Sequence, residues 1–408
     1  MNILKSSLFK YINLSVFGKL YFLINISILF SAYSFFYNAD YWGDEGHFAE
    51  TISFFSDRTI SEAVQDYPEV TPPLFYIVYS YWGKIFGNEI QTLRLLSVIT
   101  GLFSFLFVYY IFKMTTENAK ASFFASLAII LNPYLLGSHL FVYTDSLSYL
   151  FLLIIFYAVY LRSNFLLFIG AMGSLLIRQY NIFILVAVSG YAAINFLHIR
   201  NKLWIKPLIV SFISIIPLLY LFFLWNGLAP KSGLERWTTG NEAFNFRISN
   251  LVTYITFLAV YSLPFILFSV KSFWQFFKEN RNLTLTVIVI SFLYFFFPVT
   301  PSQVTLQMTG FETVGFAHRL IKVIFPIDFL EHLVLYFFFL LGLLALTFLF
   351  SGSIKKVMKK NVDYLVFLDL SVISFLLIMP FSYQVWEKYL IVILLPFAIR
   401  MLKHNNND

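Results

Sequence analysis

The sequence predicts an all-α polytopic membrane protein with about twelve transmembrane helices. Of its 408 residues, 59% are hydrophobic and only 12% are charged, and the mean hydropathy is +0.78. Apolar segments of membrane-spanning length recur from one end of the chain to the other. The absence of cysteine excludes disulfides, thiolate nucleophiles and cysteine-ligated metals.

The predicted spans follow one another along the whole chain. They cover approximately residues 20–37, 94–112, 121–141, 146–161, 164–177, 181–197, 206–225, 248–270, 283–299, 329–350, 364–381 and 389–402. The first span follows Lys5, Lys10 and Lys19 and lacks a cleavage site of small residues, which is typical of a retained signal-anchor helix.

The distribution of charge predicts the orientation of these spans. An even number of spans places both termini on one side, and the segments on that side hold 18 of the 28 Lys and Arg but only four of the 21 Asp and Glu. By the positive-inside rule, that side is cytoplasmic. The basic balance of the chain is therefore explained by membrane orientation and gives no indication of nucleic-acid binding.

One apolar segment, residues 74–87 (LFYIVYSYWGKIFG), is left out of the count. As a helix it reaches roughly 21 Å, short of the ~30 Å hydrocarbon core. Counting it as a span would invert the side of every later loop. We expect an amphipathic helix at the outer surface, which begins after Pro72 and Pro73.

The external loop 38–93 is the first candidate region for chemistry, since it holds nine of the 21 acidic residues. Its stretch WGDEGHFAE places Asp44 and Glu45 directly after the first span, where either carboxylate is a candidate general base. The same acids also suit the N-terminus of a helix. His47 is either a metal partner of Glu50 or an interfacial or hydrogen-bonded histidine, and the second is favoured because Asp-x-x-His alone is a weak metal signal.

Later external loops add further polar candidates. These are Asp145 in VYTDSLSY, Arg178 and Gln179 in IRQYN, Arg319 in FAHRL and Lys388 in VWEKYL. Asp145 also fits a helix start, and Arg178 fits an interfacial arginine. Asp369 lies within a span, far from these loops, and is expected to be structural.

Carboxylates and cations gathered on one face of the membrane favour a reaction that deprotonates a hydroxyl while a phosphate leaves. No glycine-rich phosphate loop appears in the chain. The alternative is a membrane transporter or lipid-linked-sugar flippase. Coupled transporters usually place ionisable residues near the middle of the bilayer, where the only acidic residue of this chain is Asp369.

The motifs taken together resemble the GT-C superfamily of integral membrane glycosyltransferases. YWGDEGHFAE, VTPPLFYIVY, VYTDSLSY and LIRQYNI, in this order over residues 40–185, are most similar to the dolichyl-phosphate-glucose α-1,2-glucosyltransferase family. The C-terminal PFSYQVWEKYLIVILLP departs from that family and looks more like bacterial members. The expected location is a bacterial inner membrane, or the ER membrane in a eukaryote.

The resemblance implies a GT-C fold and a hexose, with glucose as the first candidate, transferred from a polyprenyl-phosphate donor to a glycan or glycolipid acceptor. It implies no cofactor and no catalytic metal. Residues 1–200 would form the catalytic module, and residues 201–408 would determine donor-lipid and acceptor specificity. Asp44 or Glu45 would be the base, and His47, Asp145, Arg178, Gln179, Arg319 and Lys388 would bind substrate.

Overall fold

The computed structural model describes residues 15–237 and 245–404, so the predicted N-terminal cations Lys5 and Lys10 lie outside the described residues. Within this part of the chain every regular element is helical, which confirms the all-α class. The first half contains α2 (Val16–Phe35), α3 (Glu45–Ser56), α4 (Ile60–Ala63), α5 (Leu74–Phe86), α6 (Ile90–Thr116), α7 (Ala119–Ile130), α8 (Pro133–Leu140), α9 (Thr144–Leu161), α10 (Asn164–Leu175), η1 (Gln179–Asn181), α11 (Ile182–Ile199), η2 (Lys202–Trp204), α12 (Ile205–Trp225) and α13 (Lys231–Trp237).

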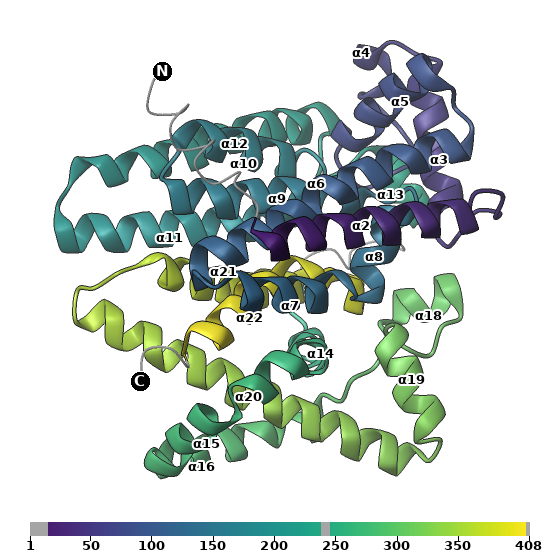
Figure 1. Ribbon diagram of the computed structural model, residues 1–408. Helices are drawn as coiled ribbons and strands as arrows, with labels where there is room; N and C mark the ends of the chain where they lie inside the picture. The colour runs from purple at the N-terminus through teal and green to yellow at the C-terminus, as the bar shows by residue number, and fades with distance from the viewer. Residues whose placement is uncertain (1–14, 238–244, 405–408) are drawn as a thin grey trace.

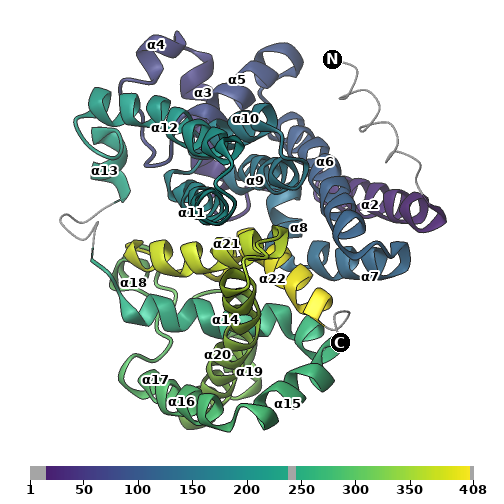
Figure 2. The ribbon, with the colours of Figure 1, turned by 90° about the vertical axis from the view of Figure 1, so that its left-hand side faces the viewer.

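The second half contains α14 (Ile248–Phe268), α15 (Val270–Glu279), α16 (Arg281–Ser291), α17 (Leu293–Phe296), α18 (Gln303–Thr309), α19 (Phe316–Ile324), α20 (Asp328–Met358), α21 (Tyr364–Ile378), η3 (Met379–Phe381), η4 (Glu387–Leu390) and α22 (Ile391–His404). It packs beside the first half, and α21 and α22 lie between the two (Figure 2). α21 packs against α11, while α22 contacts both α14 and α6.

The described residues contain eight helices that are long and apolar enough to cross a membrane, which makes this a multi-pass membrane protein. The number becomes nine if the bent pair α7 and α8 forms one span. The predicted spans 164–177, 283–299 and 389–402 correspond to the shorter α10, the pair α16 and α17, and α22. The count of twelve therefore stays a prediction.

The break between α7 and α8 has a local cause. Pro133 is the first residue of α8, and a proline disfavours helical backbone in the residue before it. The side chain of that residue, Asn132, accepts hydrogen bonds from the backbone of Tyr134 and Leu135 and so caps the new helix. The two helices meet at 72°, and α8 is redirected toward the end of the molecule that holds the candidate site.

The elements that connect the spans gather at two opposite ends of the molecule. α3, α4, α5, α18 and α19 lie at one end, while the α11–α12 and α20–α21 connections lie at the other (Figure 1). Residues 38–93, the predicted first external loop, pack against the membrane helices. A second hydrophobic core, including Phe55, Tyr67 and Tyr76, joins α3 and α5 to Trp225 of α12 and fixes this loop on the membrane helices.

The intramembrane carboxylate pairs with a cation across helices. Arg400 of α22 contacts Asp369 of α21 at 2.6 Å, and Ser353 of α20 donates a hydrogen bond to the same carboxylate. Arg400 also donates to the Leu349 carbonyl. Because an isolated charge in the membrane is costly, this pairing agrees with the predicted structural role of Asp369.

Candidate active site

A tight turn before α3 fixes the main chain at Asp44. Gly43 has φ +57°, and a Cβ at this position would lie 2.5 Å from the Tyr143 hydroxyl. That hydroxyl donates to the Trp42 carbonyl at 2.8 Å and accepts the Asp44 N–H at 3.3 Å. The Asp44 side chain makes no capping bond to α3, so its carboxylate is available for other contacts.

The Asp44 carboxylate contacts Lys388, 344 residues later in the chain. Lys388 Nζ donates to Asp44 Oδ2 at 2.8 Å, and the two side chains are 22% and 47% exposed. The Lys388 charge lowers the pKa of Asp44 well below its usual value, against the opposing effect of burial. Burial acts to lower the pKa of Lys388, but the carboxylates of Asp44 and Asp145 outweigh it and raise that pKa. Both side chains of the pair are therefore charged, and the Asp44 side chain is accessible to water.

His47 lies between two carboxylates. Its Nδ1 contacts Glu69 Oε1 at 2.5 Å, and its Nε2 faces Asp44 Oδ1 at 3.8 Å. Burial acts to lower the pKa of His47, but the hydrogen bonds and charges of these two acids raise it overall. Glu50, the alternative metal partner, instead contacts Arg236 at 3.0 Å. No cluster of three or more potential metal ligands occurs within residues 15–237 and 245–404.

The Glu45 carboxylate is buried, and both of its oxygens accept hydrogen bonds. It forms a bidentate pair with Arg94, with Nε to Oε1 at 2.8 Å and Nη2 to Oε2 at 2.6 Å, and both side chains are at most 1% exposed. Its oxygens also accept the backbone N–H groups of Trp42 and Val142. Arg94 completes its donor set with the carbonyls of residues 36, 39 and 40. This pair joins the start of α6 to the end of α2 and to α3.

Asp145 and Arg178 form a second buried pair. Arg178 Nη2 donates to Asp145 Oδ2 at 2.7 Å, and the two side chains are 7% and 6% exposed. Burial opposes the charge on Arg178, but Asp145 raises the pKa of the guanidinium. Arg178 Nε is buried without a hydrogen-bond partner among the described residues. A buried donor of this kind is costly unless a ligand or water accepts its hydrogen bond.

The structure brings Asp44, His47 and Lys388 into one network, with Asp145 and Arg178 close enough for their charges to act on Lys388. The side chains of the two remaining candidates make other contacts. Gln179 Nε2 donates to the Val70 carbonyl at 3.0 Å and so holds the segment before α5. Arg319 is exposed on α19, where its guanidinium lies 5.2 Å from the centre of the Phe311 ring.

Sequence reasoning missed Glu69 and Tyr143 as members of this network. Glu69 was one of nine acids in the loop, and no local pattern separates it from the others. Its distinguishing features appear only in three dimensions. It is 3% exposed, it contacts His47, and the Trp237 ring lies 4.6 Å from that histidine. Tyr143 directly precedes the Thr-Asp motif, which is the signal that could have identified it.

Residues 68–204 match the model of the DIE2/ALG10 family. The solved structure of ArnT from Cupriavidus metallidurans in the apo state is similar over 94% of this chain and 76% of that chain, with 14% identity and a TM-score of 0.43. No curated protein sequence matches the chain significantly. The family match confirms the predicted resemblance over a segment that contains Glu69, Arg94, Asp145 and Arg178, and it indicates a membrane glycosyltransferase.

Proposed function

We propose that this chain, similar to the DIE2/ALG10 family over residues 68–204, transfers a hexose from a polyprenyl phosphate to a hydroxyl of a glycan or glycolipid. Glucose is the first candidate for the sugar. The observation that carries the proposal is the contact of the partly exposed Asp44 with Lys388, beside the Asp145–Arg178 pair. This arrangement offers a carboxylate to a hydroxyl and cations to a phosphate within one site.

Asp44 is the proposed general base. Its carboxylate takes the proton of the acceptor hydroxyl while the oxygen bonds to the anomeric carbon. The bond from that carbon to the phosphate oxygen breaks, and polyprenyl phosphate leaves with the electron pair. Geometry favours Asp44 over Glu45, because both Glu45 oxygens already accept two hydrogen bonds in the interior.

Lys388 and Arg178 are the proposed phosphate ligands. Arg178 has an unpartnered buried Nε, and its planar guanidinium suits phosphate oxygens. Lys388 holds Asp44 as a weak base in the absence of substrate. A bound phosphate competes for Lys388 and thereby raises the basicity of Asp44. This couples donor binding to activation of the base.

The other predicted residues are assigned supporting roles. His47, held by Glu69, orients Asp44 and the acceptor, and Asp145 fixes Arg178. Gln179 positions the segment at Val70, and Arg319 is an early contact for the donor phosphate. Since Lys388 completes the site, residues 201–408 contribute to catalysis together with residues 1–200. We place the site on the extracytoplasmic face of a bacterial inner membrane, or on the lumenal face of the ER membrane in a eukaryote.

The test uses purified protein in nanodiscs with polyprenyl-phosphate glucose, mannose, galactose or arabinose and a lipid extract of the source membrane. We expect transfer from one donor in the wild type, and a loss of about 10²–10⁴-fold in Asp44→Asn, the usual contribution of a general base. Asp40→Asn, an exposed acid four residues earlier, is the matched control and should retain activity.

Each contrary outcome removes a defined part of the proposal. Use of a nucleotide sugar in place of all four donors would reject the polyprenyl-phosphate donor. Movement of lipid-linked sugar across the bilayer without transfer would favour a flippase. Full transfer by a folded Asp44→Asn variant would reject Asp44 as the base.

A further inference from the structure

Lys388 lies in η4, a short 3₁₀ helix whose first three side chains face different parts of the molecule. A 3₁₀ helix has three residues per turn, so consecutive side chains point roughly 120° apart. Lys388 Nζ reaches Asp44 at 2.8 Å, and the Tyr389 ring centre lies 5.6 Å from that of Tyr180. Glu387 faces α14 and α19. The contacts of its two neighbours therefore determine the direction in which Lys388 points.

The Glu387 carboxylate holds the start of α19. The residue is 1% exposed, and a carboxylate buried to this degree is costly unless it is hydrogen-bonded. Its Oε2 accepts the Ala317 N–H at 2.9 Å, and its Oε1 accepts the His318 N–H at 2.7 Å. The Tyr261 hydroxyl of α14 donates to Oε2 at 2.5 Å, and the Glu387 N–H donates to the Val314 carbonyl at 3.1 Å. These bonds connect the residue before Lys388 to two other helices.

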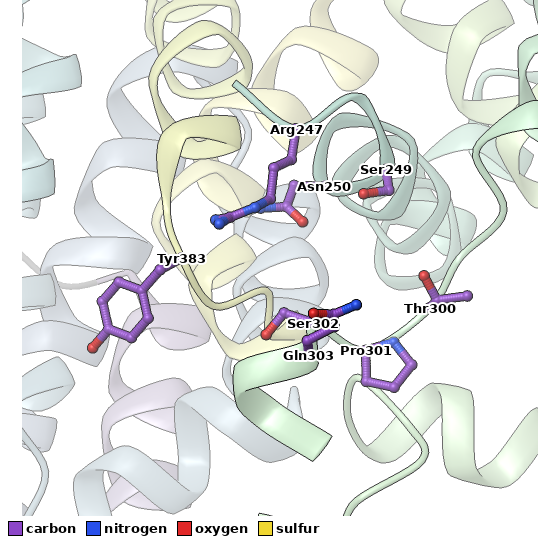
Figure 3. A pocket seen from close by; sticks show the side chains of 8 residues that line it. All are labelled: Arg247, Ser249, Asn250, Thr300, Pro301, Ser302, Gln303 and Tyr383. Carbon is purple, nitrogen blue, oxygen red and sulfur yellow. The ribbon is translucent and has the colours of Figure 1, made fainter. Parts of the chain in front are cut away.

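The loop that leads from η3 into η4 is attached to α14 at two points. At its start, Arg247 Nη1 and Asn250 Nδ2 both donate to the Ser382 carbonyl at 2.9 Å (Figure 3). A pocket of about 230 Å³ borders the loop at Tyr383, so packing on that side does not fix its position. Glu387 supplies the second attachment five residues after the first, through its hydrogen bond from α14. This second point directly precedes the lysine of the proposed site.

We propose that Glu387 is a positioning residue, which holds Lys388 on Asp44 through the backbone of η4. The lysine side chain is a flexible four-carbon stem, so an anchor on the preceding residue limits the positions that its ammonium group can reach. The inference rests on the proposed function, in which Lys388 binds the donor phosphate and Asp44 is the base. It adds that the start of α19 and the Tyr261 hydroxyl act on the proposed site through Glu387.

The first test measures the position of Lys388 and needs no turnover. Wild type and Glu387→Gln in nanodiscs are acetylated with N-hydroxysuccinimide acetate, and mass spectrometry gives the rate at Lys388 relative to the exposed Lys231. The amide keeps the shape of the side chain, but its nitrogen cannot accept a hydrogen bond, so at least one bond from Tyr261 or α19 is lost. The net free energy of one hydrogen bond corresponds to about two- to tenfold more released Lys388, and its acetylation should accelerate by this factor.

Two further variants complete this test. Glu312→Gln removes an exposed carboxylate from the same connection, where it pairs with Lys322, and it is the matched control that should leave the Lys388 rate unchanged. Tyr261→Phe removes one donor to Glu387 and leaves both bonds from α19, so it should accelerate acetylation by a smaller factor. An unchanged rate at Lys388 in folded Glu387→Gln would overturn the inference. If that variant does not fold, an unchanged rate in Tyr261→Phe would overturn it.

The kinetic test separates positioning from a loss of stability, with the donor and lipid extract of the transfer assay. In Glu387→Gln, release of Lys388 should raise the KM for donor about two- to tenfold and leave the KM for acceptor unchanged. A variant that is only less stable contains less active protein, so its apparent kcat falls while both KM values stay the same. That pattern, with unchanged acetylation of Lys388, would overturn the inference. Faster acetylation of Lys388 in Glu387→Gln, when the wild type transfers nothing, would support the inferred contact and reject the proposed function.

Discussion

Asp44 and Glu45 are neighbours in the sequence, yet their carboxylates lie in opposite environments. The Asp44 side chain is 47% exposed and meets one lysine, whereas the Glu45 side chain is fully buried and accepts four hydrogen bonds. The change of environment follows from the helix, since Asp44 is the N-cap of α3 and Glu45 is its first residue, turned toward α6. The Asp44 carboxylate can therefore exchange a proton with substrate. The Glu45 carboxylate instead stabilises the turn that positions Asp44.

Glu45→Gln should therefore lower the stability of the protein strongly. Its effect on the transfer rate of the molecules that remain folded should be smaller. Removing one partner of a buried ion pair leaves the other charge uncompensated and costs about 3–5 kcal/mol. We expect a clear drop in the Tm of the nanodisc protein. Glu235→Gln, in an exposed pair with Lys231, should leave the Tm nearly unchanged. A Glu45→Gln variant with wild-type Tm and no transfer would assign the base to Glu45.

The His47–Glu69 contact should make stability depend on pH. Burial raises the pKa of Glu69, and hydrogen bonds to two acids raise that of His47 against burial, so the folded protein holds protons more tightly than the unfolded chain at both groups. The contribution of His47 is then fully present below its unfolded pKa, near 6.5, and is lost as pH rises through the higher folded value.

The measurement is the Tm of wild type and of Glu69→Gln between about pH 5.5 and 8.5, a range that brackets the usual histidine pKa. The wild type should lose stability toward alkaline pH with a steeper slope than the variant. Equal slopes, or a slope of opposite sign, would show that His47 does not take up a proton in the folded state.

At the scale of elements, α13 fastens the first external loop to the membrane helices. Ser232 binds Asp66 through its backbone N–H and its hydroxyl, and Trp237 Nε1 donates to the Pro68 carbonyl at 3.0 Å. Gly233 allows this approach, since a Cβ there would lie 2.3 Å from the Glu69 carbonyl oxygen. The position of Glu69 against His47 therefore depends on a helix more than 160 residues away in sequence.

Gly233→Ala should destabilise the protein and weaken transfer together. The gain in helix propensity is about 1 kcal/mol, but the contact is with backbone, which cannot rotate away, and overpacking costs about 1–3 kcal/mol. Gly137→Ala in α8 is the control, because nothing lies within 4 Å of its Cβ position, and it should be neutral or slightly stabilising. Equal Tm values for the two variants would show that α13 can withdraw from Glu69 at no cost.

Some residues of the site could be predicted from sequence because each has a recognisable local pattern around it. Asp44 and Asp145 follow recognisable turns at the ends of apolar segments, and Arg178 follows an apolar run too short to leave it outside the interface. Their partners could not be predicted, because the pairing of Asp44 with Lys388 depends on how α22 packs between the two halves. Glu45 had the same local signal as Asp44, but its buried pair with Arg94 depends on tertiary packing and could not be predicted.

At the scale of the whole molecule, the membrane topology also depends on features that local sequence patterns do not determine. Apolar length predicted the long helices, but α7 and α8 bend at Asn132–Pro133, and α10 and α22 have only 12 and 14 residues. The decisive segment is α5. If it crossed the membrane, the first external loop and the α20–α21 connection would lie on the same side. Figure 1 places α4 and that connection at opposite ends of the molecule, which is expected if α5 stays on one side and all nine predicted spans from 94–112 to 329–350 cross the membrane.

Because the chain has no cysteine, single cysteines can test this arrangement without background. Gln65→Cys and Lys359→Cys are both exposed and report the two ends. In intact cells, a membrane-impermeant maleimide should label Gln65→Cys, while Lys359→Cys should react only after permeabilisation, since its basic segment is predicted to be cytoplasmic. Labelling of both from outside would mean that α5 spans the bilayer. The reverse pattern would keep the fold, move Asp44 and Lys388 to the cytoplasmic face, and require a donor presented on that side.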